Sequence, residues 1–432
     1  MTAPIPILFG RGHLPVILPN ECHAIVVEKP PMPFLEDPAR EIADRLTGVV
    51  GGENLCDLAK RAKSACVLIC DITRPVPNGL ILPPIIETLL NAGIPAERIC
   101  VLVATGLHRP NLGEELRELV GNDWVMNTVG VENHYAHDDD AHRDFGRTAE
   151  GTPVKLDRRF VDADLKIVTG LVEPHFMAGY SGGRKVISPG IAHADTIGTF
   201  HNTRFMENPS VRNCNFEGNT LHAEQLEIVG MLGPVYAVNT CLDAERRMAF
   251  VNFGEIVASH AEAVSFMREF AEVFLPKRFK CVIASSAGYP LDKTYYQTIK
   301  AIVGALGILE EGGTLLVVSE CSEGLGSEEF CNAQSLLVCR GIEGFLEQAR
   351  QRPIANVDEW QTLKLIEAIR RGRVHLFATG LSQEQRLLTG VTCHENWQEA
   401  IKAVVRESGA TEVAVIPEGP YVIPFHRQSI SR

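Results

Sequence analysis

The first half of the chain alternates short apolar runs with longer amphipathic stretches. Three of the runs have the composition of strands buried on both faces: Ala65–Cys70, Ile99–Val103 and Leu165–Leu171. Polar turns rich in proline or glycine end these runs, and helical patterns follow at Ile81–Leu90 and Leu112–Val120. A strand, a polar loop and a helix in repeated order predict an α/β fold with a doubly wound, mainly parallel sheet.

The same alternation begins again in the second half, after a boundary that we expect near Ala271–Phe279. Strands are predicted at Lys280–Ser285, Thr314–Ser319, Val374–Ala378 and Glu412–Ile416, and helices at Tyr296–Leu309, Phe345–Gln351, Glu359–Arg370 and Trp397–Ser408. We therefore predict two α/β domains, residues 1–272 and 273–432. The role of the tail, residues 417–432, is left open, because its proline-containing sequence is compatible with packing back or with fraying.

Composition excludes several classes of protein. Hydrophobic residues make up 45% and charged residues 22% of the 432 residues, which excludes disorder for most of the chain. The net charge of -13 argues against nucleic-acid binding, which needs a basic surface. Met1–Gly10 lacks a signal-peptide pattern and no apolar run has the length of a membrane span, so we expect a cytoplasmic protein without a membrane partner.

The 12 cysteines are scattered along the chain, several of them within apolar runs. This distribution predicts reduced, buried thiols rather than a disulfide framework. Cys66 and Cys70 are close together, but no second Cys or His pair follows at zinc spacing, so no structural zinc site is expected.

The chemically unusual residues follow the ends of predicted strands. Arg74 lies after the first strand, His108 after the second and His175 after the third. Ligands of open parallel sheets bind outside the carboxyl ends of the strands. We therefore expect these three side chains to face one crevice.

The first two of these loops carry groups suited to binding and to proton transfer. Arg74 can bind a carboxylate or phosphate with two hydrogen bonds, and Asp71 and Thr73 can bind sugar or phosphate oxygens. Turn chemistry with one surface ion pair explains the same residues. His108 suits acid–base catalysis, although a structural hydrogen bond is the commoner role of a loop histidine.

The third loop, residues 173–185, has the highest density of unusual residues. Its glycines permit close approach of a bulky ligand, and the amides of Ser181, Gly182 and Gly183 can cradle a phosphate. Arg184 and Lys185 add positive charge, or Lys185 forms a covalent bond to a cofactor through its amine. The spacing matches neither a nucleoside-triphosphate loop nor a dinucleotide fingerprint, so use of ATP or NAD is not supported. The alternative is a glycine turn with solvated cations.

Two further stretches indicate a function only in combination with the other motifs. His201 follows the glycine loop, and imidazole suits nickel and zinc, although a lone histidine is usually structural. Gln297 and Lys300 lie on one face of a predicted helix that begins at Tyr296, where the lysine can attract an anion. An exposed helix start explains the second stretch equally well.

Together, five stretches resemble the lactate racemase-like family: DITRP, TGLHRP, EPHFMAGYSGGRK, FHN and YYQTIK. They occur in the family's order along most of the chain; the ordered set is specific, whereas each stretch alone is weak. The resemblance implies two α/β domains with the active site in a cleft between them. It also implies nickel as a cofactor, held in the nickel-pincer nucleotide pyridinium-3-thioamide-5-thiocarboxylic acid mononucleotide.

The resemblance implies a role for each matching residue. Lys185 would be joined to the cofactor covalently, and His201 would bind nickel. His108 and His175 would be the paired acid and base on opposite sides of the substrate carbon. The implied substrate contacts are Arg74, Tyr296, Gln297, Lys300 and Trp360, and the implied cofactor contacts are Asp71, Thr73, Arg74, Ser181, Gly182 and Gly183.

The implied activity is that of a racemase or epimerase of a small 2-hydroxy acid. The C2 hydrogen of such an acid is poorly acidic, and its transfer as hydride to an electrophilic cofactor avoids a carbanion. One histidine takes the hydroxyl proton, a planar keto acid forms and turns, and hydride returns to its other face while the opposite histidine supplies the proton. The enzymes that make the cofactor are implied partners.

The stretch after His201 departs from what a plain lactate enzyme should show. Arg204, Arg212 and Asn213 lie close to it in sequence and favour a second carboxylate, as in malate, or the hydroxyls of a sugar acid. Surface exposure explains both arginines equally well.

Three other interpretations are open. An NAD-dependent hydroxy-acid dehydrogenase fits two α/β domains but lacks its glycine fingerprint here. A nickel- or nucleotide-binding protein without catalysis would bind the cofactor and not racemise. A silent relative is disfavoured by the intact histidine pair. The substrate side chain, the oligomeric state and the loading of the cofactor are not determined by the sequence.

Overall fold

The structure is a computed structural model that describes residues 4–427. The chain forms two compact units, each made of more than one stretch of sequence. Unit 1 consists of Met1–Pro30, His201–Cys214 and Phe270–Arg432, and unit 2 of Pro31–Phe200 and Asn215–Glu269. The predicted domains, residues 1–272 and 273–432, differ from these units in one respect. Met1–Pro30 and His201–Cys214 lie within the first predicted domain but belong to unit 1.

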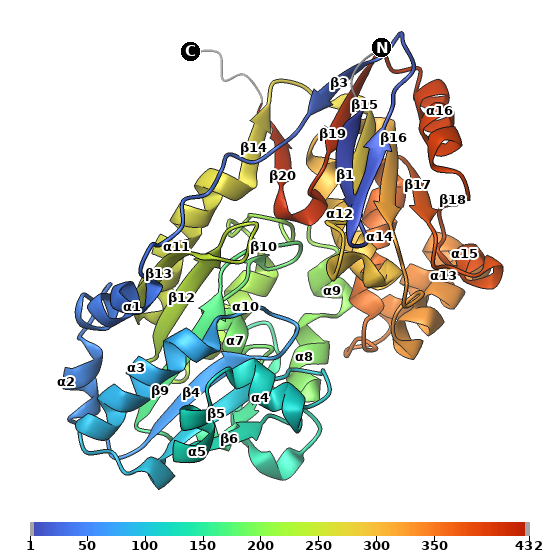
Figure 1. Ribbon diagram of the computed structural model, residues 1–432. Helices are drawn as coiled ribbons and strands as arrows, with labels where there is room; N and C mark the ends of the chain where they lie inside the picture. The colour runs from blue at the N-terminus through green and yellow to red at the C-terminus, as the bar shows by residue number, and fades with distance from the viewer. Residues whose placement is uncertain (1–3, 428–432) are drawn as a thin grey trace, which may run out of the picture. The chain divides into compact units, whose positions relative to one another are not determined.

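Unit 2 is built on a six-stranded sheet in the order β13-β12-β9-β4-β5-β6 (Figure 1). Its strands are β4 (Ala65–Cys70), β5 (Ile99–Ala104), β6 (Gly130–Asn133), β9 (Leu165–Leu171), β12 (Tyr236–Leu242) and β13 (Met248–Glu255). All neighbours pair in parallel except β12 and β13. The predicted α/β class with mainly parallel sheets is confirmed, and the three strands predicted first correspond to β4, β5 and β9.

Helices and short hairpins complete unit 2. The helices are α1 (Pro38–Thr47), α2 (Leu55–Ala59), α3 (Asn78–Asn91), α4 (Glu114–Val120), α5 (Asp123–Thr128), α6 (Arg158–Val161), α7 (Arg184–Ile187), α8 (Ala194–Phe200), α10 (Thr220–Gly230) and α11 (Ile256–Ala271), with 3-10 turns at Ala96–Arg98 and Asp139–Ala141. Two-stranded pairs are formed by β7 (His142–Arg147) with β8 (Pro153–Asp157), and by β10 (Pro174–His175) with β11 (Gly179–Tyr180).

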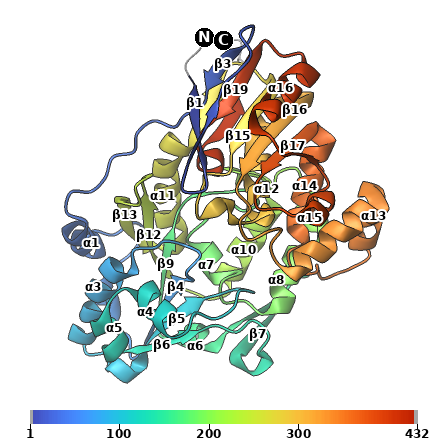
Figure 2. The same cartoon turned by 45° about the vertical axis from the view of Figure 1, so that its right-hand side comes forward.

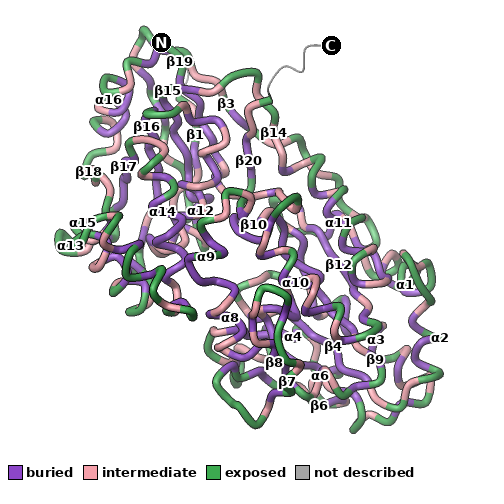
Figure 3. Tube along the Cα trace, turned by 180° about the vertical axis from the view of Figure 1, so that it is seen from behind, coloured by how far each residue is buried: buried purple, intermediate pink, exposed green. Residues whose placement is uncertain are grey.

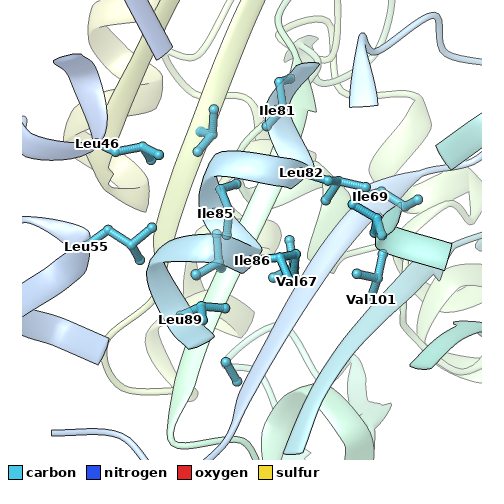
Figure 4. Packing of buried hydrophobic residues seen from close by; sticks show 14 of the residues in the cluster. Leu46, Leu55, Val67, Ile69, Ile81, Leu82, Ile85, Ile86, Leu89 and Val101 are labelled. Carbon is cyan, nitrogen blue, oxygen red and sulfur yellow. The ribbon is translucent and has the colours of Figure 1, made fainter. Parts of the chain in front are cut away.

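Helix α3 supplies much of the apolar core of unit 2. Its buried residues recur at helical spacing, so they form one face that packs on the sheet. Figure 4 shows side chains of this face next to those of β4 and β5. The residues concerned are Ile81, Leu82, Ile85, Ile86 and Leu89 of the helix, Val67 and Ile69 of β4, and Val101 of β5.

Unit 1 has its own six-stranded sheet, in the order β18-β17-β16-β15-β19-β3. Its strands are β3 (His23–Val26), β15 (Phe279–Ser285), β16 (Leu309–Ser319), β17 (Arg373–Ala378), β18 (Thr392–His394) and β19 (Glu412–Ile416), and all pair in parallel. Figure 2 shows the N-terminal strand β3, in blue, beside the C-terminal strand β19, in red. The edge strand therefore comes from the start of the chain.

The other elements of unit 1 are as follows. The helices are α9 (Thr203–Met206), α12 (Tyr295–Gly304), α13 (Glu328–Arg350), α14 (Glu359–Arg371), α15 (Gln383–Leu388) and α16 (Trp397–Ser408), with 3-10 turns at Leu291–Lys293, Ala305–Gly307 and Gly419–Tyr421. Two-stranded pairs are β1 (Ile5–Phe9) with β2 (Gly12–Val16), and β14 (Glu272–Leu275) with β20 (Ile423–His426).

The predicted elements of the second half are largely confirmed, with two differences. Helix α12 ends at Gly304 rather than at Leu309, which already belongs to β16. A Cβ at Gly307 would lie 2.2 Å from the carbonyl oxygen of Pro424, so this close approach favours glycine there. The helix predicted at residues 345–351 is the last part of α13, which is interrupted at Gly341, where φ is 68°.

The described part of the tail packs against unit 1. Ile423–His426 forms β20 and pairs in parallel with β14, while residues 428–432 lie outside the described residues. Figure 3 shows the strands of each sheet coloured mostly as buried. Within residues 4–427, no helix has the length and apolar character needed to cross a membrane.

Candidate active site

Three neighbouring strand ends in unit 2 carry most of the residues singled out from the sequence. Strands β9, β4 and β5 are adjacent and parallel, so their carboxyl ends meet at one edge of the sheet. Two side-chain contacts show that the loops after these strands lie together: Asp71 with His108, and Arg74 with Glu173.

His108, after β5, is held by a carboxylate that follows β4. Its Nδ1 lies 2.6 Å from Oδ2 of Asp71, and Thr73 donates its hydroxyl to Oδ1 of the same carboxylate, also at 2.6 Å. Burial opposes the charge of Asp71, but the hydrogen bonds from His108 and Thr73 outweigh it and lower the pKa of the carboxyl. The side chain of His108 is 62% exposed and that of Asp71 is 8% exposed. An accessible imidazole therefore has a buried, ionised partner.

Arg74 is paired with a carboxylate that the sequence did not predict as its partner. Its Nη1 lies 2.9 Å from Oε2 of Glu173, in the loop after β9. A guanidinium has five N–H donors, so this ion pair leaves donors for a ligand carboxylate or phosphate. Glu173 belongs to a predicted motif, but sequence spacing does not show that it meets a residue from another strand end.

His175 lies in the short β10–β11 hairpin after β9. Its Nδ1 accepts the backbone N–H groups of Met177, at 3.2 Å, and Ala178, at 3.1 Å. The ring is buried and stacks on Phe176 with 5.0 Å between the ring centroids. The two predicted histidines thus have different partners, a carboxylate for one and backbone amides for the other.

Ser181, which follows the hairpin, is engaged within its own loop. Its amide donates to the carbonyl of Glu173 at 2.9 Å, and its hydroxyl donates to the carbonyl of Leu171 at 2.7 Å. The Ser181 amide is therefore not available to cradle a phosphate in this conformation, contrary to the expectation from the sequence.

Gly182 and Gly183 come next and have φ values of +76° and +49°, a region that favours glycine. Both are buried, and within the described part of the chain neither amide donates to a protein acceptor. Two buried amides without acceptors suit the oxygen atoms of a phosphate or carboxylate. Lys185 lies in α7, directly after them, and is partly buried.

Arg184, beside the predicted cofactor lysine, is fully buried, although the sequence suggested only that it adds positive charge to this loop. Its Nη2 donates to the carbonyl of Ala178 at 2.7 Å and to that of Tyr180 at 3.4 Å. Burial lowers the pKa of its guanidinium to about 9. Its other neighbours are His260 and the ring of Phe216. Neither lies in a recognisable motif, so no sequence signal identified them.

The remaining predicted site residues belong to unit 1. His201 is buried, and its ring centroid lies 4.9 Å from that of Trp360 in α14. Trp360 donates its Nε1–H to the hydroxyl of Tyr296 at 3.3 Å. Three residues predicted from separate motifs thus form one cluster in this unit.

The predicted substrate contacts of unit 1 differ in their surroundings. Gln297, in the first turn of α12, has a buried Oε1 with no hydrogen-bond partner within residues 4–427, so it can accept a hydrogen bond from a ligand. Lys300 is partly buried on the same helix. Arg204 and Arg212 are exposed, and Arg204 lies over the ring of Phe205. Asn213 is partly exposed. The predicted placement of all these residues in a cleft between domains stays a prediction.

A cavity of about 910 Å³ in unit 1 contains none of these residues. It is lined by parts of α13, β17 and β18, and several of its polar side chains are paired with protein groups. His375 contacts Glu407 at 3.0 Å and His394 at 2.9 Å, and Arg386 donates to three backbone carbonyls. Its histidine and Arg386 are therefore engaged within the protein.

Comparison with family models identifies both parts of the chain. The model of the lactate racemase N-terminal domain matches residues 9–213, and the model of the lactate racemase C-terminal domain matches residues 276–424. These two matches cover the histidine loops, the glycine loop, His201 and the segment with Gln297 and Lys300.

Characterised relatives agree with the family models. The chain is 32% identical to a lactate racemase of Lactiplantibacillus plantarum over 88% of this chain and 89% of the relative. It is 28% identical to a lactate racemase of Thermoanaerobacterium thermosaccharolyticum over 98% of this chain and 99% of the relative. The structure of the lactate racemase apoprotein from the latter organism superposes with a TM-score of 0.90 at 26% identity, covering 99% of this chain and 100% of that one. The chain therefore belongs to the lactate racemase family of isomerases.

Proposed function

We propose that this enzyme interconverts the enantiomers of lactate or of a related small 2-hydroxy acid, using a nickel-pincer nucleotide attached to Lys185. The observation that carries the proposal is the His108–Asp71 pair beside the Arg74–Glu173 pair at three adjoining strand ends. This arrangement supplies a base and a carboxylate-binding cation in one region of unit 2. A racemase of this substrate class needs both groups.

The residues present fit the proposed cofactor. The buried amides of Gly182 and Gly183, which have no protein acceptor within residues 4–427, suit anionic oxygens of a mononucleotide. Lys185 follows them and would supply the amine of the covalent link. His201 would bind the metal through its imidazole, beside Trp360. When bound, the nickel-pincer nucleotide supplies an acceptor for the substrate hydride.

Proton transfer is the task of the histidines in this proposal. Asp71 accepts a hydrogen bond from the Nδ1–H of His108, which leaves the lone pair on Nε2 to take the substrate hydroxyl proton. The imidazolium that forms is stabilised by the ionised Asp71. His175 would supply or take the proton on the opposite face of the substrate carbon.

Orientation of the substrate carboxylate falls to Arg74 and Lys300. Arg74 keeps donors free beyond its ion pair with Glu173. Gln297, whose Oε1 lacks a partner within the described residues, would accept a hydrogen bond from another donor group of the bound ligand. Tyr296 would pack beside Trp360 at the same ligand.

The substrate side chain is a separate part of the proposal. Arg204, Arg212 and Asn213 offer cationic and amide groups close in sequence to His201, which would suit malate or a sugar acid. Turnover of lactate, malate and gluconate by the loaded enzyme would be compared by chiral chromatography. Lactate as the best substrate would remove the role assigned to these three residues.

Covalent loading is the most direct test. The protein would be produced together with the enzymes that make the cofactor, and its intact mass measured. We expect added mass in the wild type, its loss in Lys185→Ala, and its retention in Lys402→Ala, an exposed lysine of α16. An unchanged wild-type mass contradicts the cofactor assignment.

Catalysis is tested on the loaded protein with one enantiomer of each acid. The proposal predicts formation of the other enantiomer without added NAD. Reduction of added NAD would instead support the dehydrogenase interpretation, and loaded protein without turnover would support a non-catalytic cofactor-binding protein.

The twelve free cysteines fit a reducing, cytoplasmic location.

A further inference from the structure

We infer that the two proposed catalytic histidines rest in opposite tautomers, His108 with its proton on Nδ1 and His175 with its proton on Nε2. Asp71 positions the first ring, and Arg184 positions the loop that holds the second. The inference rests on the proposed function for its catalytic meaning, whereas the tautomers are properties of the folded chain and can be measured without turnover.

The tautomer of His108 follows from the chemistry of its partner. Asp71 is ionised near neutral pH, because its pKa is lowered, and a carboxylate can only accept hydrogen bonds. The 2.6 Å contact between Nδ1 and Oδ2 therefore requires a proton on Nδ1. A neutral His108 then has its lone pair on Nε2, in an exposed side chain that a substrate hydroxyl can reach.

The tautomer of His175 follows from the opposite chemistry. Backbone N–H groups can only donate, and those of Met177 and Ala178 both point at Nδ1. Nδ1 must therefore hold a lone pair, which leaves the proton of a neutral ring on Nε2. In this tautomer Nε2 donates hydrogen bonds and cannot accept a proton.

Arg184 fixes the turn that imposes this tautomer. Ala178 donates its N–H to His175 and accepts a hydrogen bond from Arg184 at its carbonyl, at 2.7 Å. The guanidinium also reaches the carbonyl of Tyr180, so it holds both sides of Gly179. Within residues 4–427 it has no carboxylate partner, and burial of such a cation is costly. An apolar side chain would avoid this cost, but only a side chain with several donors can hold two carbonyls.

The two rings therefore differ in what catalysis demands of them. His108 can accept the hydroxyl proton on Nε2 as it stands, because the O–H bond breaks, an Nε2–H bond forms, and the positive charge faces Asp71. His175 can take up or supply a proton at Nε2 only when a second proton occupies Nδ1, since a neutral ring that lost its Nε2 proton would become an imidazolate. A proton on Nδ1 displaces the amides of Met177 and Ala178. The turn at residues 176–178 must open for the second histidine and not for the first.

The test is nitrogen NMR of the full-length protein labelled with 15N-histidine, at about pH 8, where an ordinary imidazole is neutral. His108→Gln and His175→Gln variants would assign the two rings. The unprotonated ring nitrogen resonates well apart from the protonated one. We expect it to be Nε2 in His108 and Nδ1 in His175. The same protonated nitrogen in both rings, or a proton on Nδ1 of His175, overturns the inference.

Two pairs of variants test the positioning residues. Asp71→Ala should shift His108 to mainly the Nε2-protonated form and lower kcat by about 10²–10⁴-fold, whereas Thr73→Val keeps the carboxylate and should keep the tautomer. Arg184→Met should give His175 a mixture of tautomers, and Arg184→Lys should restore part of the wild-type population. If Arg184→Met does not fold, the wild-type spectrum still decides.

The outcomes separate this inference from the proposed function. Opposite tautomers in a loaded protein that racemises no 2-hydroxy acid would leave the inference standing and remove the function. Racemisation by a protein whose two rings share one tautomer would support the proposed function and overturn the inference about the tautomers.

Discussion

Two glycines with almost the same backbone conformation show what the active-site loop demands of a single residue. Gly113 has φ 58° and ψ -128°, Gly183 has φ 49° and ψ -124°, and each precedes the first residue of a short helix. A Cβ at Gly113 would meet nothing within 4 Å, whereas one at Gly183 would lie 2.8 Å from the ring of His260. A side chain at either glycine would therefore strain the backbone to a similar extent. Only a side chain at Gly183, in the cofactor loop, would also clash with a neighbouring residue.

We expect Gly113→Ala to lower the free energy of unfolding by about 1–3 kcal/mol, because a side chain is strained at this φ and ψ. Gly183→Ala should lower it further, by about another 1–3 kcal/mol, since the buried His260 ring has to move. Urea unfolding of both variants measures the difference. Equal losses would show that His260 yields freely and that the loop is not tightly packed.

The sequence singled out several residues that the fold brings together, but it did not predict their contacts. The motifs drew attention to Asp71, Arg74, His108 and His175 because they follow buried strands. Asp71 was expected at a cofactor oxygen, yet it contacts His108, and Arg74 contacts Glu173. Which strand end lies beside which depends on sheet order, and no local pattern in the sequence encodes that order.

At the scale of elements, the segment 201–214 illustrates a non-local assignment. It lies between two stretches of unit 2 in sequence and yet belongs to unit 1. Asn202 donates to the carbonyl of Pro353 at 2.8 Å, Lys364 of α14 donates to the carbonyl of Val211 at 2.5 Å, and Glu207 pairs with Arg350. These contacts hold the segment that carries His201.

Lys364→Met should loosen this segment. The Lys364 side chain is 4% exposed, so its loss leaves the Val211 carbonyl without its charged donor, at a cost of about 1–3 kcal/mol. Amide hydrogen exchange of residues 203–213 should become faster, and nickel retention by the loaded protein should fall if His201 is the ligand. Lys402→Met is the matched control, because its ion pair with Glu399 is exposed and its loss should cost less than about 0.5 kcal/mol. Unchanged exchange in Lys364→Met would show that the other contacts suffice.

Elements with strong periodicity were predicted well, and short elements were not. β4, β9, β19 and α16 have the predicted bounds, because each combines a clear apolar pattern with a turn or cap at its end. Helix α16 begins after the capping Asn396 and ends at Gly409 in the left-handed conformation. Strand β3 gives no such signal, since its four residues become a strand only through pairing with β19.

At the scale of the whole molecule, both units have the same kind of architecture, a six-stranded sheet with mainly parallel strands. Each therefore contains one edge where several strand ends meet, and the predicted site residues divide between the two units. His108, His175 and Lys185 belong to unit 2, and His201 and Gln297 belong to unit 1. The boundary predicted from the sequence, at residue 272, lies close to Phe270, where the last segment of unit 1 begins. The assignment of residues 1–30 and 201–214 to unit 1 depends instead on long-range contacts.

The acid stability of unit 2 should depend on Asp157, which is fully buried at the end of β8. Burial raises its pKa, but hydrogen bonds from Arg159 and His134 outweigh this and lower the pKa from 3.8 to about 2. A carboxyl with a lower pKa in the folded state stabilises the fold above its unfolded pKa of about 4, and the contribution disappears as the pH falls through 2. The shift corresponds to about 2 kcal/mol.

Asp157→Asn should therefore lower the free energy of unfolding by about 2 kcal/mol above pH 5, and the difference from the wild type should shrink as the pH falls from 4 toward 2. Denaturant titrations between pH 2 and pH 8 measure both curves. Asp44→Asn serves as the control, because that aspartate is exposed on α1 and its variant should follow the wild type at every pH. A difference between Asp157→Asn and the wild type that stays constant down to pH 2 would mean that the carboxylate contributes through packing and not through its charge.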